Sequence, residues 1–105
     1  MKHIKTFESQ NLKELKKYVV WKMKFVLVIL EVVYQDDGAI QLKRLYKYLP
    51  EVEFKRLRIR ETDQDMYTFS EEEVKENVIY ESDNLDDCLD VDLLYSLFNA
   101  DKYNL

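Results

Sequence analysis

The spacing of apolar residues changes along the chain, and each spacing predicts an element. Residues 20–34 start with apolar residues at every second position and continue as an almost unbroken apolar run, which favours one long strand. Two aspartates and a glycine follow at 36–38, and these residue types tolerate the positive φ of a tight turn. We therefore expect the chain to double back into a second strand at 39–49, which ends at Pro50.

Alternation continues along and beyond this second strand. One of its faces is expected to carry Ile40, Leu42, Tyr46 and Tyr48. Residues 52–61 predict a third strand, because Leu57 and Ile59 alternate with arginines. Residues 66–69 predict a short fourth strand, and residues 78–80 fit either a strand or a loop.

Three segments have the features of helices. Residues 10–18 carry apolar residues at helical spacing among lysines, which predicts a short basic helix. Ser70 and Glu73 have the form of a capping box at the start of a helix over 71–77. An amphipathic C-terminal helix is expected at about 86–100, where aspartates at its start favour the positive end of the helix dipole.

Together these elements predict an α+β fold. We expect a small antiparallel sheet of three to five strands, built on the long 20–34/39–49 hairpin and flanked by two or three short helices. A length of 105 residues predicts a single domain over 1–105. Residues 25–30 are apolar on both faces, so this strand should be central and covered on both sides. Because short helices cover only part of such a surface, we expect a homodimer.

Composition limits the class of protein. The chain is 47% hydrophobic and 35% charged, which is typical of a folded rather than a disordered protein. Cys88 is the only cysteine, and residues 1–10 are polar and basic without an apolar stretch behind them, so we expect no disulfide within the chain and no secretory signal. These features favour the cytoplasm, or the host cytoplasm for a viral protein. The most apolar window is interrupted by Lys22, Lys24 and Glu31, so no membrane-spanning helix is expected.

Charge divides the sequence into two halves. Residues 1–60 carry 14 Lys and Arg against 7 Asp and Glu, a net charge of +7, whereas residues 61–105 carry 2 against 14, a net charge of −12. The whole chain has a net charge of −5 at pH 7. Such a division can hold two parts of a domain together, make subunits pair, or present one sign of charge to a partner.

The residue types that most catalytic sites need are scarce. Triad-type nucleophilic catalysis needs a base, usually histidine, and the only histidine is His3. Loops that hold nucleotide phosphates are rich in glycine, and Gly38 is the only glycine. A structural zinc site needs several thiolates or imidazoles, whereas the chain has one cysteine and one histidine. We therefore expect a non-enzymatic protein with no catalytic residues, cofactor or metal.

Two carboxylate patterns in the sequence resemble metal sites. Residues 83–90 are as dense in aspartate as a calcium loop but lack its glycine and glutamate at the required positions, so a helix start accounts for them better. The acidic residues and lysine of a restriction-endonuclease-like pattern are matched by Asp36, Asp37, Glu53 and Lys55. The same Glu-x-Lys spacing recurs at 14–16 and 73–75, which makes this match weak.

Two charged surfaces are candidates for binding a macromolecule. A basic sheet face with aromatic rings suits single-stranded nucleic acid, and its candidate residues are Lys43, Lys47, Arg56, Arg58 and Arg60, with Tyr46, Tyr48 and Phe54 among them. The same cations could instead pair with the acidic segment, within one chain or between two. An acidic surface could occupy the place of phosphates on a basic partner, and its candidates are Glu71, Glu72, Asp83, Asp86, Asp87 and Asp90. Cys88 is expected to be a small buried hydrophobe.

The net negative charge favours a protein partner over nucleic acid. The sequence therefore predicts a small acidic non-enzymatic protein that binds a macromolecule, preferably a protein, through its acidic segment or its apolar sheet face. An inhibitor, an immunity protein and a viral or phage accessory protein all fit this description. The alternative is a nucleic-acid-binding module that uses the basic and aromatic face.

Overall fold

The computed structural model describes residues 14–36 and 38–103 of the chain. The helix predicted at 10–18 begins outside the described residues. Its described part is wrong, because residues 14–17 are not helical and Tyr18 starts a strand. The amides of this segment are held by acceptors on other elements instead: Leu15 N donates to Gln35 Oε1 at 3.0 Å and Lys16 N donates to Glu81 Oε1 at 2.8 Å.

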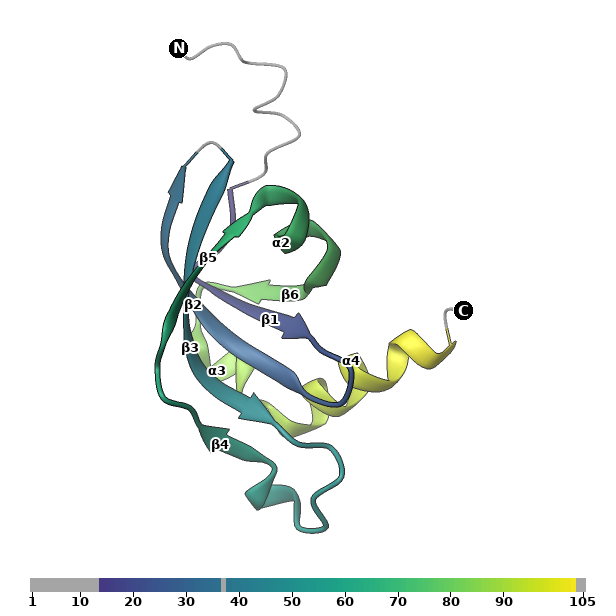
Figure 1. Cartoon of the computed structure of the whole chain (residues 1–105). Helices are drawn as coiled ribbons and strands as arrows, with labels where there is room; N and C mark the ends of the chain where they lie inside the picture. Colours follow the sequence, from purple (N-terminus) through teal and green to yellow (C-terminus); the bar gives the residue numbers. More distant parts are fainter. Residues whose placement is uncertain (1–13, 37, 104–105) are drawn as a thin grey trace.

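The centre of the molecule is a six-stranded antiparallel sheet (Figure 1). Its strands are β1 (Tyr18–Lys22), β2 (Leu27–Asp36), β3 (Ala39–Tyr48), β4 (Ile59–Glu61), β5 (Met66–Ser70) and β6 (Val78–Ser82). The order is β4-β3-β2-β1-β6, and β5 pairs with the first half of β3 while β4 pairs with its end. The predicted α+β class is confirmed, with six strands where three to five were expected.

The strand predicted at 20–34 is two strands joined by a tight turn. Lys22 pairs with Leu27, and Met23 N donates to Val26 O at 2.9 Å. Only two residues therefore lie between Met23 and Val26, in the turn. Those two residues are Lys24 and Phe25, neither of which is a typical turn former. No turn-forming residue therefore marks the reversal that separates β1 from β2.

The hairpin of β2 and β3 is confirmed, and Gly38 lies in its turn with a φ of +83°. The register shifts within it, since Ile29 pairs with Tyr46 whereas Leu30 pairs with Arg44, which leaves an extra residue in β3. Such a β-bulge reverses the alternation of side chains along a strand. The expected single face of β3 is therefore wrong: Ile40 and Leu42 lie in one core cluster and Tyr46 and Tyr48 contact the other.

The strand predicted at 52–61 is mostly a loop. Only Ile59–Glu61 forms strand β4, and Lys55–Leu57 forms a single turn of 3-10 helix, η1. Arg58 closes this loop, because its backbone oxygen accepts from Leu49 N at 2.7 Å and its Nε donates to Val52 O at 2.8 Å. The strand predicted from the alternation of arginine with apolar residues is therefore wrong for residues 52–58 and right only for Ile59–Glu61.

Helix α2 (Glu71–Asn77) forms where it was predicted, with both bonds of the capping box present. Glu73 N donates to Ser70 Oγ at 3.2 Å, and Ser70 N donates to Glu73 Oε1 at 3.0 Å. The residues at 78–80 belong to strand β6.

The helix predicted at 86–100 is two helices, α3 (Leu85–Cys88) and α4 (Val91–Tyr103). The division falls at Asp90, whose Oδ1 accepts from the backbone amides of Asp92 and Leu93 at 3.0 and 3.2 Å. An acceptor at this position starts a new helix, since it satisfies amides that have no partner within the helix.

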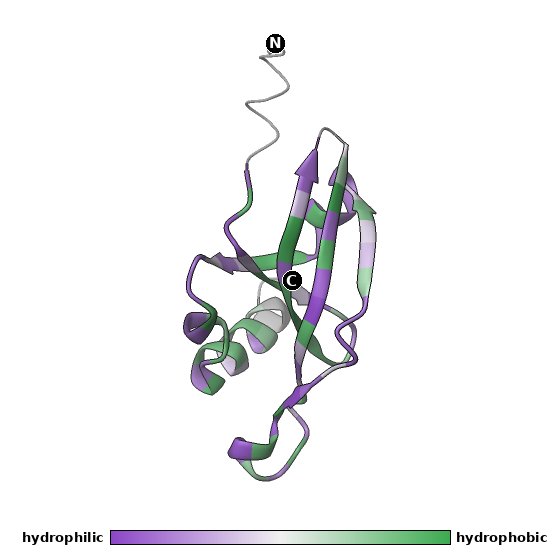
Figure 2. Cartoon of the chain, turned by 90° about the vertical axis from the view of Figure 1, so that its left-hand side faces the viewer, coloured by the Kyte–Doolittle hydropathy of each residue, from purple (hydrophilic) through white to green (hydrophobic). Residues whose placement is uncertain are grey.

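Two apolar clusters lie on opposite faces of the sheet. The first contains Val19, Trp21, Val28, Leu30, Ile40, Leu42 and, from α2, Val74. The second contains Val20, Leu27, Ile29, Tyr48 and, from α3 and α4, Cys88 and Leu94. In Figure 2, hydrophobic and hydrophilic segments alternate along the strands and the C-terminal helix. The prediction of a central strand covered on both faces is confirmed for Leu27–Leu30, which are all buried, whereas Phe25 is exposed in the turn.

This arrangement bears on the expected homodimer. The reason for expecting a second subunit was an apolar face too large for short helices to cover, and both faces of the central strand are buried within one chain. The core therefore does not require a dimer, and the homodimer stays a prediction. Among the helices of the described residues, none is long and apolar enough to cross a membrane.

Candidate functional site

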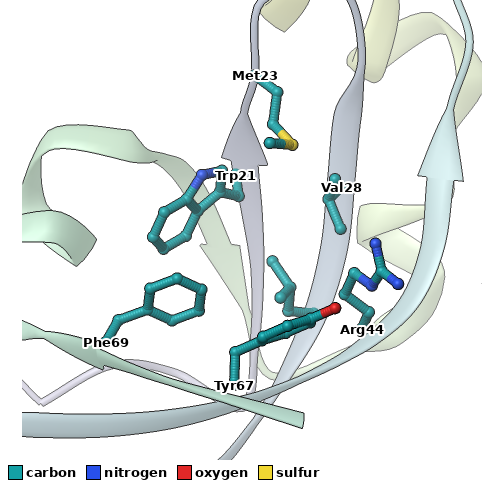
Figure 3. A pocket seen from close by; sticks show the side chains of 7 residues that line it. Trp21, Met23, Val28, Arg44, Tyr67 and Phe69 are labelled. Carbon is teal, nitrogen blue, oxygen red and sulfur yellow. The ribbon is translucent and has the colours of Figure 1, made fainter. Parts of the chain in front are cut away.

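An apolar pocket opens beside the first core cluster, on the same face of the sheet as α2 (Figure 3). Its volume is about 310 Å³, and it is lined by Trp21, Met23, Val28, Leu30, Arg44, Tyr67 and Phe69. Trp21, Val28 and Leu30 are also members of the core cluster. The pocket is thus a part of the core that the chain leaves open.

Strand β5 forms one wall of the pocket. Tyr67 and Phe69 alternate along this strand and pair with Leu42 and Ile40, which places both rings on the face of the first cluster. The ring centroids of Trp21 and Phe69 are 4.5 Å apart, and those of Tyr67 and Phe69 are 6.1 Å apart. Because β1 and β5 are not neighbours in the sheet, this contact requires the sheet to curl around the pocket.

The rim of the pocket exposes apolar surface. Met23 is 49% exposed and Tyr67 is 40% exposed, although both side chains line the pocket. Phe25, two residues after Met23 in the turn between β1 and β2, is also exposed. Exposed apolar groups gathered around a concave site are typical of binding surfaces.

Among the described residues that line the pocket, Arg44 is the only charged one. Its Nη2 lies 3.4 Å from Asp65 Oδ2, and its guanidinium carbon lies 5.3 Å from the centre of the Tyr67 ring. The Nε of Arg44 is buried and has no hydrogen-bond partner among the described residues. Figure 3 shows Arg44 and Tyr67 close together at the edge of the pocket.

Two further cations lie next to the pocket on the same face. Val28, which lines the pocket, pairs with Lys47, and Lys47 pairs with Arg60 on β4. Directly paired residues of neighbouring strands lie on the same face of a sheet. Within residues 14–36 and 38–103, neither Lys47 nor Arg60 forms an ion pair.

The other predicted basic residues lie elsewhere. Lys43 precedes Arg44 on β3 and therefore lies on the opposite face of the sheet. Arg58 lies 5.8 Å from the ring of Tyr95 on α4, and Arg56 lies 6.0 Å from the ring of Phe54. Of the five basic candidates, the structure thus brings only Lys47 and Arg60 together.

The aromatic rings expected beside these cations are not free for stacking. Tyr48 is fully buried and Tyr46 packs partly buried against the second cluster, so only Phe54 is exposed. The rings that accompany the cations are those of the pocket, Trp21 and Tyr67 among them. The sequence did not indicate these rings as part of the site. Alternation of apolar residues shows which face of a strand a ring occupies but not that β5 pairs with β3, which brings Tyr67 and Phe69 towards Trp21.

The six acidic candidates lie on helices that cover opposite faces of the sheet. Glu71 and Glu72 are in the first turn of α2, and Asp86 and Asp87 are in α3. Asp83 precedes the N-cap residue of α3, and Asp90 comes directly before α4. Three of them hold the local structure: Asp83 accepts from Lys17 N, Asp87 accepts from Ser82 Oγ, and Asp90 caps α4. The six residues therefore do not make one continuous surface.

The described carboxylates of the nuclease-like pattern, Asp36 and Glu53, are separated, and Asp37 lies outside the described residues. Asp36 lies at the start of the β2–β3 hairpin turn, whereas Glu53 and Lys55 lie beyond the other end of β3, a strand of about 30 Å. In the described part of the chain, no group of three or more metal-ligating side chains comes together. Lys55 contacts Asp92 of α4 at 3.2 Å instead.

Cys88 is completely buried in the second cluster, as predicted. Burial raises the pKa of its thiol to about 11, and the nearby carboxylate of Asp87 adds to this rise. The thiol is therefore protonated at neutral pH and has no nucleophilic character there. His3 lies outside the described residues.

Comparison of the chain with protein-family models, with curated proteins and with solved structures finds no match. The fold and the site together define a small α+β protein with a curled antiparallel sheet and an open apolar pocket.

Proposed function

We propose that this chain is a non-enzymatic binding protein whose partner is another protein, and that the partner docks on the pocket face. The pocket face comprises the pocket lining together with Lys47 and Arg60. One observation carries the proposal: a pocket lined by core residues stays open, with Met23 and Tyr67 exposed at its rim. Leaving such apolar surface in water costs free energy that a docked partner would recover.

The chemistry of the lining supports binding rather than catalysis. Six of the seven lining residues carry apolar or aromatic side chains, and the seventh is Arg44. The described part of the lining thus contains no carboxylate, imidazole or thiol that could transfer a proton or attack a substrate. An inhibitor, an immunity protein or a viral accessory protein acting in the cytoplasm would need no more than such a surface.

The test compares capture of a partner by the wild-type chain and by two matched variants. Met23→Lys places a charge at the pocket rim, and Tyr34→Lys makes a similar change at an exposed aromatic residue of β2 outside the pocket. The immobilised proteins are incubated with extract of the cells that produce the chain. We expect wild type and Tyr34→Lys to retain a common protein that Met23→Lys loses.

The retained protein is then purified and titrated into the wild-type chain while the fluorescence of Trp21 is recorded. The chain has one tryptophan, and it lines the pocket, so a partner on the pocket face changes its emission. Equal retention by Met23→Lys, unchanged Trp21 emission, or no protein retained by wild type would each overturn the proposal.

A nucleic-acid-binding module is the second candidate, supported by the neighbouring positions of Lys47 and Arg60 beside aromatic residues. It predicts retention of the chain on single-stranded oligonucleotides that weakens steeply with salt. Lys47→Ala and Arg60→Ala would each reduce retention, whereas Arg58→Ala would not, because Arg58 lies against α4. Failure to bind at about 50 mM salt, where screening is weak, would remove this candidate.

The expected homodimer is tested separately by light scattering during size-exclusion chromatography. The charge division along the sequence predicts that a dimer held by it dissociates between about 50 mM and about 500 mM salt. A monomer at both salt concentrations would contradict the homodimer and leave the pocket face available to another protein.

A further inference from the structure

We propose that the pocket takes one large aromatic side chain of an acidic segment of the partner, and that a carboxylate beside this side chain binds Arg44 and Lys47. This inference rests on the proposed function, since it specifies the chemistry of the protein that docks on the pocket face.

The pocket is large enough to take one aromatic side chain. Its volume of about 310 Å³ is at the lower end of the roughly 300–1,000 Å³ found for ligand sites. Its walls are the rings of Trp21 and Phe69, packed together at 4.5 Å, with Val28 and Leu30 at the sheet. An aromatic residue buries a large apolar area at the cost of few rotatable bonds, and aromatic rings pack well edge to face against one another.

Arg44 is positioned to bind an anion next to such a side chain. A guanidinium has five N–H donors, and its only side-chain partner among the described residues is Asp65 at 3.4 Å, which is long for a charge-assisted hydrogen bond. The ring of Tyr67 stacks near the guanidinium, and Nε is buried without a partner. The Arg44 side chain is 33% exposed, so a carboxylate from the docked segment would bind its terminal N–H groups and compete with Asp65 for the guanidinium.

The charge of the pocket face favours an acidic segment. Arg44 and Lys47 flank Val28 and Leu30 in the register of β2 and β3, and Arg60 continues the row on β4. Asp65 is the carboxylate that faces Arg44, and Lys47 and Arg60 form no ion pair in the described part of the chain. Beside the pocket, this row thus sets three cations against the carboxylate of Asp65 on a chain whose net charge is −5, and an acidic segment that lies along the row complements it.

Nucleic acid fits the same face less well. Nucleobases stack on aromatic side chains whose ring faces are open to solvent. Trp21, in contrast, is only 9% exposed and lies against Phe69. A side chain that enters from above needs a concave opening rather than a flat ring, and the pocket provides one. Binding of an oligonucleotide is therefore an outcome against this inference.

The experiment uses three synthetic ten-residue peptides without tryptophan. The first has a central phenylalanine flanked by aspartates, the second replaces the phenylalanine with alanine, and the third replaces the aspartates with lysines. Each peptide is titrated into the full chain at about 50 mM salt, with the emission of Trp21 as the signal. We expect the first peptide to bind at least tenfold more tightly than either of the others.

Matched variants assign the two parts of the peptide to their sites. Lys47→Gln is expected to weaken the first peptide several-fold and to leave the third peptide no weaker, whereas Lys43→Gln removes the same charge from the opposite face and leaves both unchanged. Arg44→Gln should also reduce the preference for aspartate over lysine flanks, and the double variant Arg44→Gln/Lys47→Gln should reduce it further. Unchanged thermal unfolding of each variant shows that the effect is not a loss of folding.

Three results would overturn the inference: no binding of the first peptide up to 1 mM, equal binding of the first and third peptides, or binding of a single-stranded oligonucleotide in preference to all three. Its failure is distinguishable from failure of the proposed function. If Met23→Lys loses the natural partner but the first peptide does not compete for that partner, the pocket face binds a protein of different chemistry and only this inference is wrong.

Discussion

The rings of Trp21 and Phe69 lie with their centroids 4.5 Å apart and their planes inclined by 39°. Trp21 is on β1 and Phe69 is on β5, and two strands of the sheet, β2 and β3, separate them. Their contact therefore closes the curl of the sheet, and the same two rings form a wall of the pocket. Stability of the sheet and shape of the pocket depend on one pair of side chains.

Phe69→Ala is expected to lower the free energy of unfolding by about 2–4 kcal/mol, somewhat less than for a fully buried phenylalanine because Phe69 is partly exposed. The emission of Trp21 should move to longer wavelength, because the indole gains water on the side that Phe69 covers. Urea unfolding followed by fluorescence measures both effects. Phe54→Ala removes an exposed ring and is the control; equal losses in the two variants would contradict the role of the Trp21–Phe69 contact.

The sequence predicted the class of fold because its strongest signals are local. The capping box of Ser70 and Glu73 involves neighbours in the chain, as does the turn at Gly38. The turn at Lys24 and Phe25 has no turn-forming residue, so its only visible sign was an apolar run too long for one strand. Tertiary pairing of β1 with both β2 and β6 determines that turn, and periodicity does not contain this information.

Ser70→Ala removes the acceptor for Glu73 N and is expected to cost about 1 kcal/mol of unfolding free energy. Glu73→Ala removes the reciprocal bond to Ser70 N. Because the two bonds belong to one capping box, the double variant should lose less than the sum of the single variants. Glu72→Ala changes an exposed carboxylate of the same turn and is the control. Additive losses, or a loss in Glu72→Ala equal to that in Ser70→Ala, would contradict a coupled cap.

Tyr48 is fully buried, and its hydroxyl has no hydrogen-bond partner among the described residues. A buried hydroxyl without a partner costs about 1–3 kcal/mol in proteins. Tyr48→Phe keeps the ring and removes the hydroxyl, so the variant should be at least as stable as wild type and up to about 1 kcal/mol more stable. Tyr46→Phe, at a partly exposed ring of the same strand, should change little. Thermal unfolding measures both, and destabilisation of Tyr48→Phe by more than 1 kcal/mol would show that the hydroxyl is bonded.

The candidate site could be predicted only in part. Charge patterning identified Lys47 and Arg60 as members of a basic face, and their pairing on β3 and β4 brings them together. The pocket beside them depends on the bulge between Tyr46 and Arg44, which turns Arg44 to the side of Trp21. A one-residue shift of this kind reverses every later side chain, and no residue type in the sequence marks it.

Cys88 makes the stability of the protein depend on pH in the alkaline range. Burial raises the pKa of its thiol from the ordinary 9.0 to about 11 in the folded chain. Below pH 9 the thiol is protonated in both the folded and the unfolded chain, so it contributes no pH dependence. Between pH 9 and 11 the unfolded chain releases the proton and the folded chain keeps it, and the free energy of unfolding therefore falls as pH rises, by up to about 3 kcal/mol.

Urea unfolding of wild type and Cys88→Ala at pH 7.5, 9 and 10.5 isolates this contribution. The variant is less stable at pH 7.5, because it loses a buried side chain of the second cluster, but its stability should fall less steeply above pH 9. Tyrosine and lysine titrations are common to both proteins and cancel in the difference between the two profiles. The difference should therefore shrink as pH rises, and parallel profiles from pH 7.5 to 10.5 would contradict a buried thiol that stays protonated in the folded chain.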